Sequence, residues 1–213
     1  MYLATYTYLN GKLGADQWLA ATPESVFLKH QYWRAWTTLF VHGDAGHLGS
    51  NLFLFAPLCY WLTGYFDLLF FPVAGFVIGG LVNLLVLKTM PAQATLIGVS
   101  GVVYWMGAAA LTLFLLVDRR HSLKRRFSTA LFLFLMLFVP DTYMPQVSYS
   151  SHLFGFLAGV PSAALLYAWR RKDFEKAEVK EIIFDEPTTV AVADEPQDLD
   201  DVELPPPRER YWN

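Results

Sequence analysis

The stretch Thr89–Val117, TMPAQATLIGVSGVVYWMGAAALTLFLLV, contains no charged residue in its 29 positions. Its first third carries proline, glutamine, glycine and serine, whereas the remainder from Val102 is almost entirely apolar. About 18 consecutive apolar residues are enough for a helix to cross the hydrocarbon core of a bilayer. The stretch therefore predicts a membrane-spanning helix that begins close to Ser100.

Comparable apolar runs lie on both sides of this stretch. Residues 51–87 contain one charge and leave room for two helices joined by a tight turn, residues 142–169 contain none, and residues 127–139 form a shorter run that needs flanking residues to cross. In lipid, backbone groups can pair only within helices or closed barrels, and these runs have helical lengths. We therefore expect an all-α polytopic membrane protein with five visible spans, near residues 48–64, 69–87, 99–117, 127–140 and 152–169.

Charge is distributed unevenly along the chain. Residues 1–172 hold 12 Lys and Arg against 6 Asp and Glu, whereas residues 173–213 hold 4 against 13. The basic residues gather at 119–126 and 170–172, at the ends of apolar runs. This placement puts both clusters on the cytoplasmic side of a membrane and does not match a nucleic-acid-binding surface.

This orientation gathers three polar residues. If the basic clusters are cytoplasmic, the first, third and fifth visible spans all begin at the outer face. Their first turns carry His47, Ser100 and His152 respectively. Polar groups inside a bilayer are costly and usually serve a function, so this outer end of the bundle is the candidate site.

The chain divides into three regions. Residues 1–46 contain neither an 18-residue apolar run nor a signal peptide, and we expect an external loop that starts with the end of a lost first span. Residues 47–172 form the expected membrane core. Residues 173–213 are acidic and proline-containing, which predicts a disordered cytoplasmic tail. The single cysteine, Cys59, excludes an internal disulfide or a multi-cysteine metal cluster.

Ser100 lies in the run Gly98-Val99-Ser100-Gly101. At a helix N-terminus, free backbone N–H groups and the positive end of the dipole can stabilise an oxyanion. The soluble G-x-S-x-G nucleophile motif is not met, because Val102 replaces its second glycine. Taken alone, the serine is more typical of an ordinary helix cap.

His152 shares one helical face with Gly155 and Gly159, at spacings i+3 and i+7. Small residues on that face allow close approach of a neighbouring helix. If the neighbour is the helix that begins at Ser100, the serine and histidine have nucleophile-and-base geometry. Tyr104, one turn after Ser100, could pack against the imidazole. Alone, His152 would be a hydrogen-bonded packing residue.

His47 and Asn51 lie one turn apart on the first visible span and offer hydrogen-bond donors for an oxyanion. The alternative is a three-histidine metal site formed with His42 and His152. No Asp or Glu is obviously placed to activate a metal-bound water, so we expect no metal and no cofactor.

These motifs together resemble the rhomboid family of intramembrane serine proteases, over Tyr32–Trp169. The resemblance rests on G-V-S-G followed by Tyr104, on S-H-x-x-G-x-x-x-G at 151–159, on H-x-x-x-N at 47–51, and on Trp33-Arg34 in the first external loop. The sixth-span motif of the family begins with alanine, where this chain has serine. The family pattern has six spans, so the first of them is expected to be missing here.

The resemblance implies a serine endopeptidase that cleaves membrane proteins in or near their transmembrane segments. Ser100 would be the nucleophile and His152 the base, with His47 and Asn51 at the oxyanion. The supporting residues would be Tyr104, Gly98, Gly101, Gly155, Gly159, Trp33 and Arg34. The expected partners are transmembrane substrates and lipid, in a bacterial inner membrane with the tail cytoplasmic. A catalytically silent relative that binds membrane helices is the alternative, and a transporter is disfavoured by the lack of mid-span polar residues.

Overall fold

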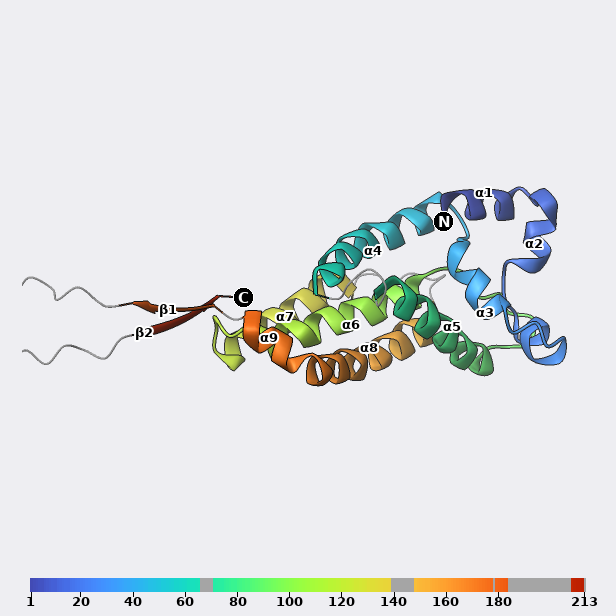
Figure 1. Ribbon diagram of the computed structural model, residues 1–213. Helices are drawn as coiled ribbons and strands as arrows, with labels where there is room; N and C mark the ends of the chain where they lie inside the picture. The colour runs from blue at the N-terminus through green and yellow to red at the C-terminus, as the bar shows by residue number, and fades with distance from the viewer. Residues whose placement is uncertain (66–70, 139–147, 178, 184–207, 213) are drawn as a thin grey trace, which may run out of the picture.

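Five long helices dominate the part of the chain that the computed structural model describes, which is residues 1–65, 71–138, 148–177, 179–183 and 208–212. They pack side by side as a bundle (Figure 1). Their bounds are α4 Ala45–Tyr65, α5 Phe71–Thr89, α6 Ser100–Val117, α7 Leu123–Phe138 and α8 Tyr149–Trp169. The predicted all-α membrane bundle is thus confirmed, and the turn predicted between the first two spans falls largely outside the described residues.

Helix α6 occupies the centre of the bundle and contacts α4, α5, α7 and α8. Its residues Gly101–Ala110 are all buried. This burial follows from its composition, because small residues and glycine let four neighbours approach one helix. By length and composition, α6 and α8 are long and apolar enough to cross a membrane.

The closest helix contact in the bundle joins α6 and α8. A side chain at Gly155 would place its Cβ 2.1 Å from the carbonyl oxygen of Gly101, and one at Gly159 would lie 2.4 Å from the carbonyl oxygen of Trp105. Only glycine fits at both positions. The indole of Trp105 also donates a hydrogen bond to Ser162 Oγ at 3.1 Å. The two helices therefore meet backbone to backbone, as the glycine spacing predicted.

The N-terminal region folds over one end of the bundle (Figure 1). Its short helices are α1 Tyr2–Leu9, α2 Ala15–Trp18 and α3 Arg34–Thr37, joined by 3₁₀ and π turns. The Trp36 indole lies against Gly80 of α5, where a Cβ would come within 2.0 Å of the ring. Asn83 of α5 donates to the Ala35 carbonyl at 2.8 Å. Two contacts to one helix thus anchor this region.

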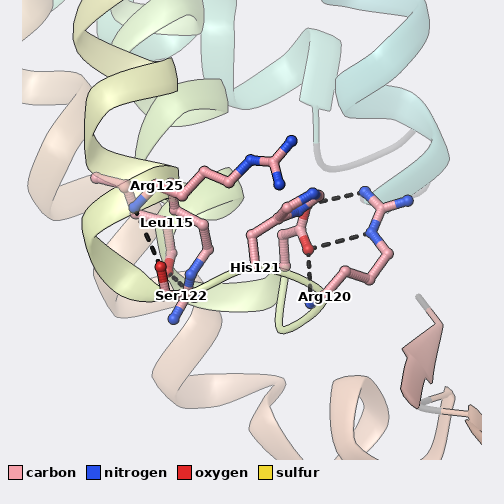
Figure 2. Close-up of polar contacts among 7 residues, drawn as sticks. Leu115, Arg120, His121, Ser122 and Arg125 are labelled. Carbon is pink, nitrogen blue, oxygen red and sulfur yellow. Dashed lines mark hydrogen bonds and ion pairs between the residues drawn. The ribbon is translucent and has the colours of Figure 1, made fainter.

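The turn between α6 and α7 lies at the opposite end of the bundle, and Figure 2 shows its polar contacts. Arg120 forms a bidentate ion pair with the buried Asp118 carboxylate, with nitrogen–oxygen distances of 3.1 and 2.8 Å. Arg126 donates to the Leu115 carbonyl at the end of α6 at 2.5 Å. Ser122 Oγ accepts from the Arg125 N–H at the start of α7. The last two bonds each satisfy one backbone group at a helix end, the Leu115 carbonyl of α6 and the Arg125 N–H of α7.

The acidic tail was predicted to be disordered. In the structure, α9 covers Arg171–Ala177, and strand β1 Val179–Ile183 pairs antiparallel with β2 Arg208–Trp212. The register pairs Val179 with Trp212. The stretch between the strands, 184–207, lies outside the described residues.

The α6–α8 contact makes a direct prediction for Gly155. Replacing it with alanine pushes a methyl group into the backbone of α6, so we expect the free energy of unfolding to fall by about 1–3 kcal/mol or more. Thermal unfolding in detergent measures this loss. The matched control is Gly49→Ala on α4, where a new Cβ meets no atom within 4 Å. Equal stability of the two variants would contradict the assigned contact.

Candidate active site

A cavity of about 600 Å³ opens where α4, α6 and α8 begin. The predicted site residues Ser100, Tyr104, His152, His47 and Asn51 all line it. Because each helix contributes residues from its first two turns, the shared orientation of the three helices brings these side chains together. The cavity combines a polar rim with an apolar part formed by Leu54, Met90, Leu96, Ile97 and Val103.

Ser100 is the first residue of α6, and the loop before it is held from three directions. Gly98 has a positive φ of 105°, and its N–H donates to the Thr38 carbonyl at 3.0 Å. The Thr38 hydroxyl in turn donates to the Leu96 carbonyl, and Leu96 forms a β-bridge with Ala21. A residue other than glycine at position 98 would be strained. Within the described part of the chain, Ser100 Oγ forms no hydrogen bond.

His152 is held by ring stacking. Its imidazole is 6% exposed and lies parallel to the Tyr104 ring, with centroids 3.7 Å apart and an interplanar angle of 15°. The Tyr104 hydroxyl donates to the Phe138 carbonyl at 2.6 Å, which fixes the tyrosine in turn. Nδ1 of His152 is buried without a hydrogen-bond partner among the described residues, which leaves Nε2 as the nitrogen that faces the cavity. The stacked Tyr104 ring thus holds the imidazole in one orientation.

His47 extends from the first turn of α4 toward the loop before Ser100. Its Nε2 and Cε1 lie 3.1 Å from the position that a Cβ would take on Gly98. Nδ1 accepts a long hydrogen bond of 3.4 Å from the Gly43 N–H. An accepting Nδ1 puts the proton of a neutral imidazole on Nε2, where it can be donated into the cavity.

Asn51 directs its amide nitrogen along α4 and not at the loop before Ser100. Its side-chain nitrogen donates to the His47 carbonyl, one turn earlier, at 2.8 Å. This bond steadies the first turn of α4, and the amide would have to rotate to reach an oxyanion beside Ser100. The helix spacing that predicted its place in the cavity does not determine its rotamer.

His42 lies behind the cavity and does not line it. The side chain is fully buried, its Nδ1 contacts Thr5 Oγ1 at 3.3 Å, and its ring meets that of His47 edge-on with centroids 5.1 Å apart. Among the described residues, no three His, Cys, Asp or Glu side chains gather as a metal site. Burial lowers the His42 pKa to about 4, with a further contribution from His47.

Trp33 and Arg34 lie in the N-terminal region and do not line the cavity. Arg34 donates to the Ala20 carbonyl at 2.9 Å, and its guanidinium lies 5.2 Å from the centre of the Trp33 ring. Trp33 itself is 45% exposed. Their contacts tie α3 to the segment before it, and that segment pairs with the loop leading to Ser100. Their role is therefore to support the loop.

Sequence reasoning gave no capping role to two polar residues of the cavity lining, Asp44 and Ser148. Asp44 Oδ1 accepts from the His47 N–H at 2.8 Å, and Ser148 Oγ accepts from the Ser151 N–H at 3.3 Å. Each is an N-cap contact at the start of α4 or α8. The signal was available, because Asp or Ser directly before the first turn of an apolar helix is the ordinary capping pattern.

The buried His42 predicts a specific pH dependence of stability. The unfolded chain protonates this imidazole below about pH 6.5, whereas the folded protein keeps it neutral down to about pH 4. The free energy of unfolding should therefore fall as pH drops through this window, by an amount on the order of 3 kcal/mol. Thermal unfolding of the wild type and His42→Gln in detergent, at several pH values, measures the difference in slope. The same slope in both proteins would contradict the buried neutral state.

The family comparison agrees with this geometry. The family model for the rhomboid domain matches residues 29–169, which include all five long helices and the cavity. No curated protein and no solved structure matches the chain. The match covers well over half of the sequence, and the helices carry the apolar composition of a membrane protein. The chain is a membrane protein that belongs to the rhomboid family.

Proposed function

We propose that this rhomboid-family protein is an intramembrane serine endopeptidase in which Ser100 is the nucleophile and His152 the general base. The observation that carries the proposal is the backbone contact between α6 and α8, which sets both side chains on one cavity with the imidazole fixed against Tyr104. A serine at a helix start is suited to nucleophilic catalysis when it shares a cavity with a histidine held in one orientation.

The first half of the reaction forms an acyl-enzyme. Ser100 Oγ attacks the carbonyl carbon of a peptide bond while His152 Nε2 takes the hydroxyl proton. The tetrahedral oxyanion lies near the backbone N–H of Ser100, which is one of the unpaired donors at the start of α6, and near the protonated Nε2 of His47. His152 then gives its proton to the leaving amine, and the carbon–nitrogen bond breaks.

The second half of the reaction consumes water. His152 takes a proton from a water molecule, the resulting hydroxide attacks the acyl carbon, and the proton returns to Ser100 Oγ as the ester bond breaks. A water supply is consistent with a cavity of about 600 Å³ whose rim includes Asp44, Ser50 and Ser148. No metal or cofactor enters this scheme.

The substrates of the proposed activity are transmembrane proteins. Rhomboid-family proteins act on transmembrane substrates within the membrane, and a helix must unwind locally before its carbonyl can reach Ser100. We expect cleavage beside a small residue near the outer face. The basic clusters at 119–126 and 170–172 support an orientation with the tail in the cytoplasm of a bacterial inner membrane.

A fluorophosphonate probe tests the assignment of the nucleophile. The purified protein in detergent should be labelled on Ser100 and should cleave a transmembrane peptide, because the probe reacts with activated serine hydroxyls. Ser100→Ala should lose both, and His152→Ala should lose at least about 10³-fold in rate. Mass spectrometry of the labelled peptide identifies the residue. Labelling that survives in Ser100→Ala would contradict the proposal.

The second candidate function is a catalytically silent rhomboid-family protein that binds membrane helices. One observation favours it: no hydrogen bond involves Ser100 Oγ among the described residues, so the serine and histidine must approach to about 3 Å before proton transfer. A wild-type protein that binds a transmembrane peptide but shows neither labelling nor cleavage would support this candidate.

Two substitutions of Tyr104 distinguish an orienting role of its ring from a purely structural role. Tyr104→Phe keeps the stacked ring and loses the hydroxyl bond to Phe138, whereas Tyr104→Leu removes the ring that holds His152. We expect kcat to fall about 10²-fold in the leucine variant with KM little changed, and much less in the phenylalanine variant. Steady-state cleavage kinetics measure both. Equal losses in the two variants would contradict orientation by stacking.

A further inference from the structure

We infer that Asp44 gives the site a preference for substrates that carry Lys or Arg close to the cleaved bond, and a bias against Asp or Glu there. The inference rests on the proposed peptidase function and adds a determinant of specificity. Asp44 belongs to none of the motifs that identify the family in this sequence. It acts on the substrate's side chain and takes no part in bond making.

Asp44 lies at the rim of the cavity that holds Ser100. It lines this cavity together with His47 and Ser100. Its Oδ1 accepts the His47 N–H at 2.8 Å, and His47 reaches the loop at Gly98, two residues before the serine. His47 thus lies between the Asp44 carboxylate and the loop before Ser100. A substrate segment that presents a carbonyl to Ser100 would enter the cavity that Asp44 lines.

The Asp44 carboxylate has no ion-pair partner in the described part of the chain. Among the cavity-lining residues that the structure describes, Asp44 is the only Asp, Glu, Lys or Arg. Of the cations in the N-terminal region, Lys29 pairs with Glu24 and Arg34 donates to the Ala20 carbonyl. The negative potential of the rim is therefore available to a substrate, and an acidic substrate side chain would meet like-charge repulsion.

The expected size of the preference for basic over acidic substrate side chains follows from the solvent exposure of Asp44. Asp44 is exposed to solvent, so water and salt screen its charge. Exposed pairs of this kind are worth about two- to fivefold in an equilibrium or a rate ratio. The preference should also weaken as ionic strength rises, because the Debye length falls from about 10 Å at 0.1 M to about 3 Å at 1 M salt.

The alternative role for Asp44 is to cap the N-terminus of α4, without any effect on substrate choice. Asn caps a helix about as well as Asp and has nearly the same shape. Asp44→Asn therefore keeps the cap and removes the charge. Asp16→Asn is the matched control, because it removes the same charge from an exposed position in the external region outside the cavity.

The experiment uses the full chain in detergent and one cleaved transmembrane peptide. Lys, Gln or Glu is placed in turn at each of the three positions on either side of the cleaved bond, and kcat/KM is measured. In the wild type and Asp16→Asn, we expect a Lys-to-Glu ratio of about 4–25 at one or more positions, since attraction and repulsion multiply. In Asp44→Asn the ratio should approach one, and in Asp44→Lys it should invert.

The outcomes separate the two proposals. Cleavage with the same Lys-to-Glu ratio in the wild type and in Asp44→Asn overturns the role of Asp44 and leaves the peptidase function standing. Cleavage with no charge preference at any position overturns it in the same way. Absence of cleavage together with absence of fluorophosphonate labelling on Ser100 overturns the peptidase function, and the inference falls with it. A ratio that collapses only in the Asp44 variants supports the inference.

Discussion

The contact on which the rest of the structure depends is the one between the α6 backbone at Gly101 and Gly155 of α8. The space there cannot hold even a methyl group. A contact so close fixes the depth of one helix against the other as well as their separation. It lies within one turn of both Ser100 and His152, so the relative height of these side chains follows directly from it. The site is therefore a consequence of helix packing, with loops refining the position.

The loop before Ser100 is held by contacts from outside the loop, because the positive φ at Gly98 is not stabilised by helix α6 itself. The N-terminal region supplies this support through the Ala21–Leu96 bridge and the two Thr38 bonds. That region is itself seated on α5 by the Trp36 ring over Gly80. The N-terminal segments thus act on the site by holding the backbone that carries the serine, without lining the cavity.

Much of this arrangement could be predicted from the sequence. Long apolar runs predict helices, because backbone groups in lipid can pair only within helices or closed barrels. The gathering of His47, Ser100 and His152 at one end followed from counting spans. The start of α7 was predicted four residues late, because its first turn carries the basic residues Lys124, Arg125 and Arg126 and the apolar criterion ignores them.

Other features could not be predicted, for physical reasons. The Asn51 amide donates to the His47 carbonyl, and the side-chain rotamer that makes this bond depends on local packing. The pairing of residue 21 with residue 96 joins segments 75 positions apart with no sequence pattern of their own. The β1–β2 pairing was hidden by the acidic composition around it. In each case the deciding interaction joins residues far apart in the sequence or depends on a side-chain rotamer. Helical periodicity and charge patterns carry no information about either.

The central claim is that Ser100 attacks a carbonyl whose oxygen turns toward the start of α6 and His47. An experimental structure of the covalent fluorophosphonate adduct tests it most directly, because the phosphonyl oxygen stands in for the tetrahedral oxyanion. The account predicts phosphorus bonded to Ser100 Oγ, with this oxygen within about 3 Å of the Ser100 N–H and His47 Nε2. Attachment to another residue, or an oxygen turned away from both donors, would contradict it.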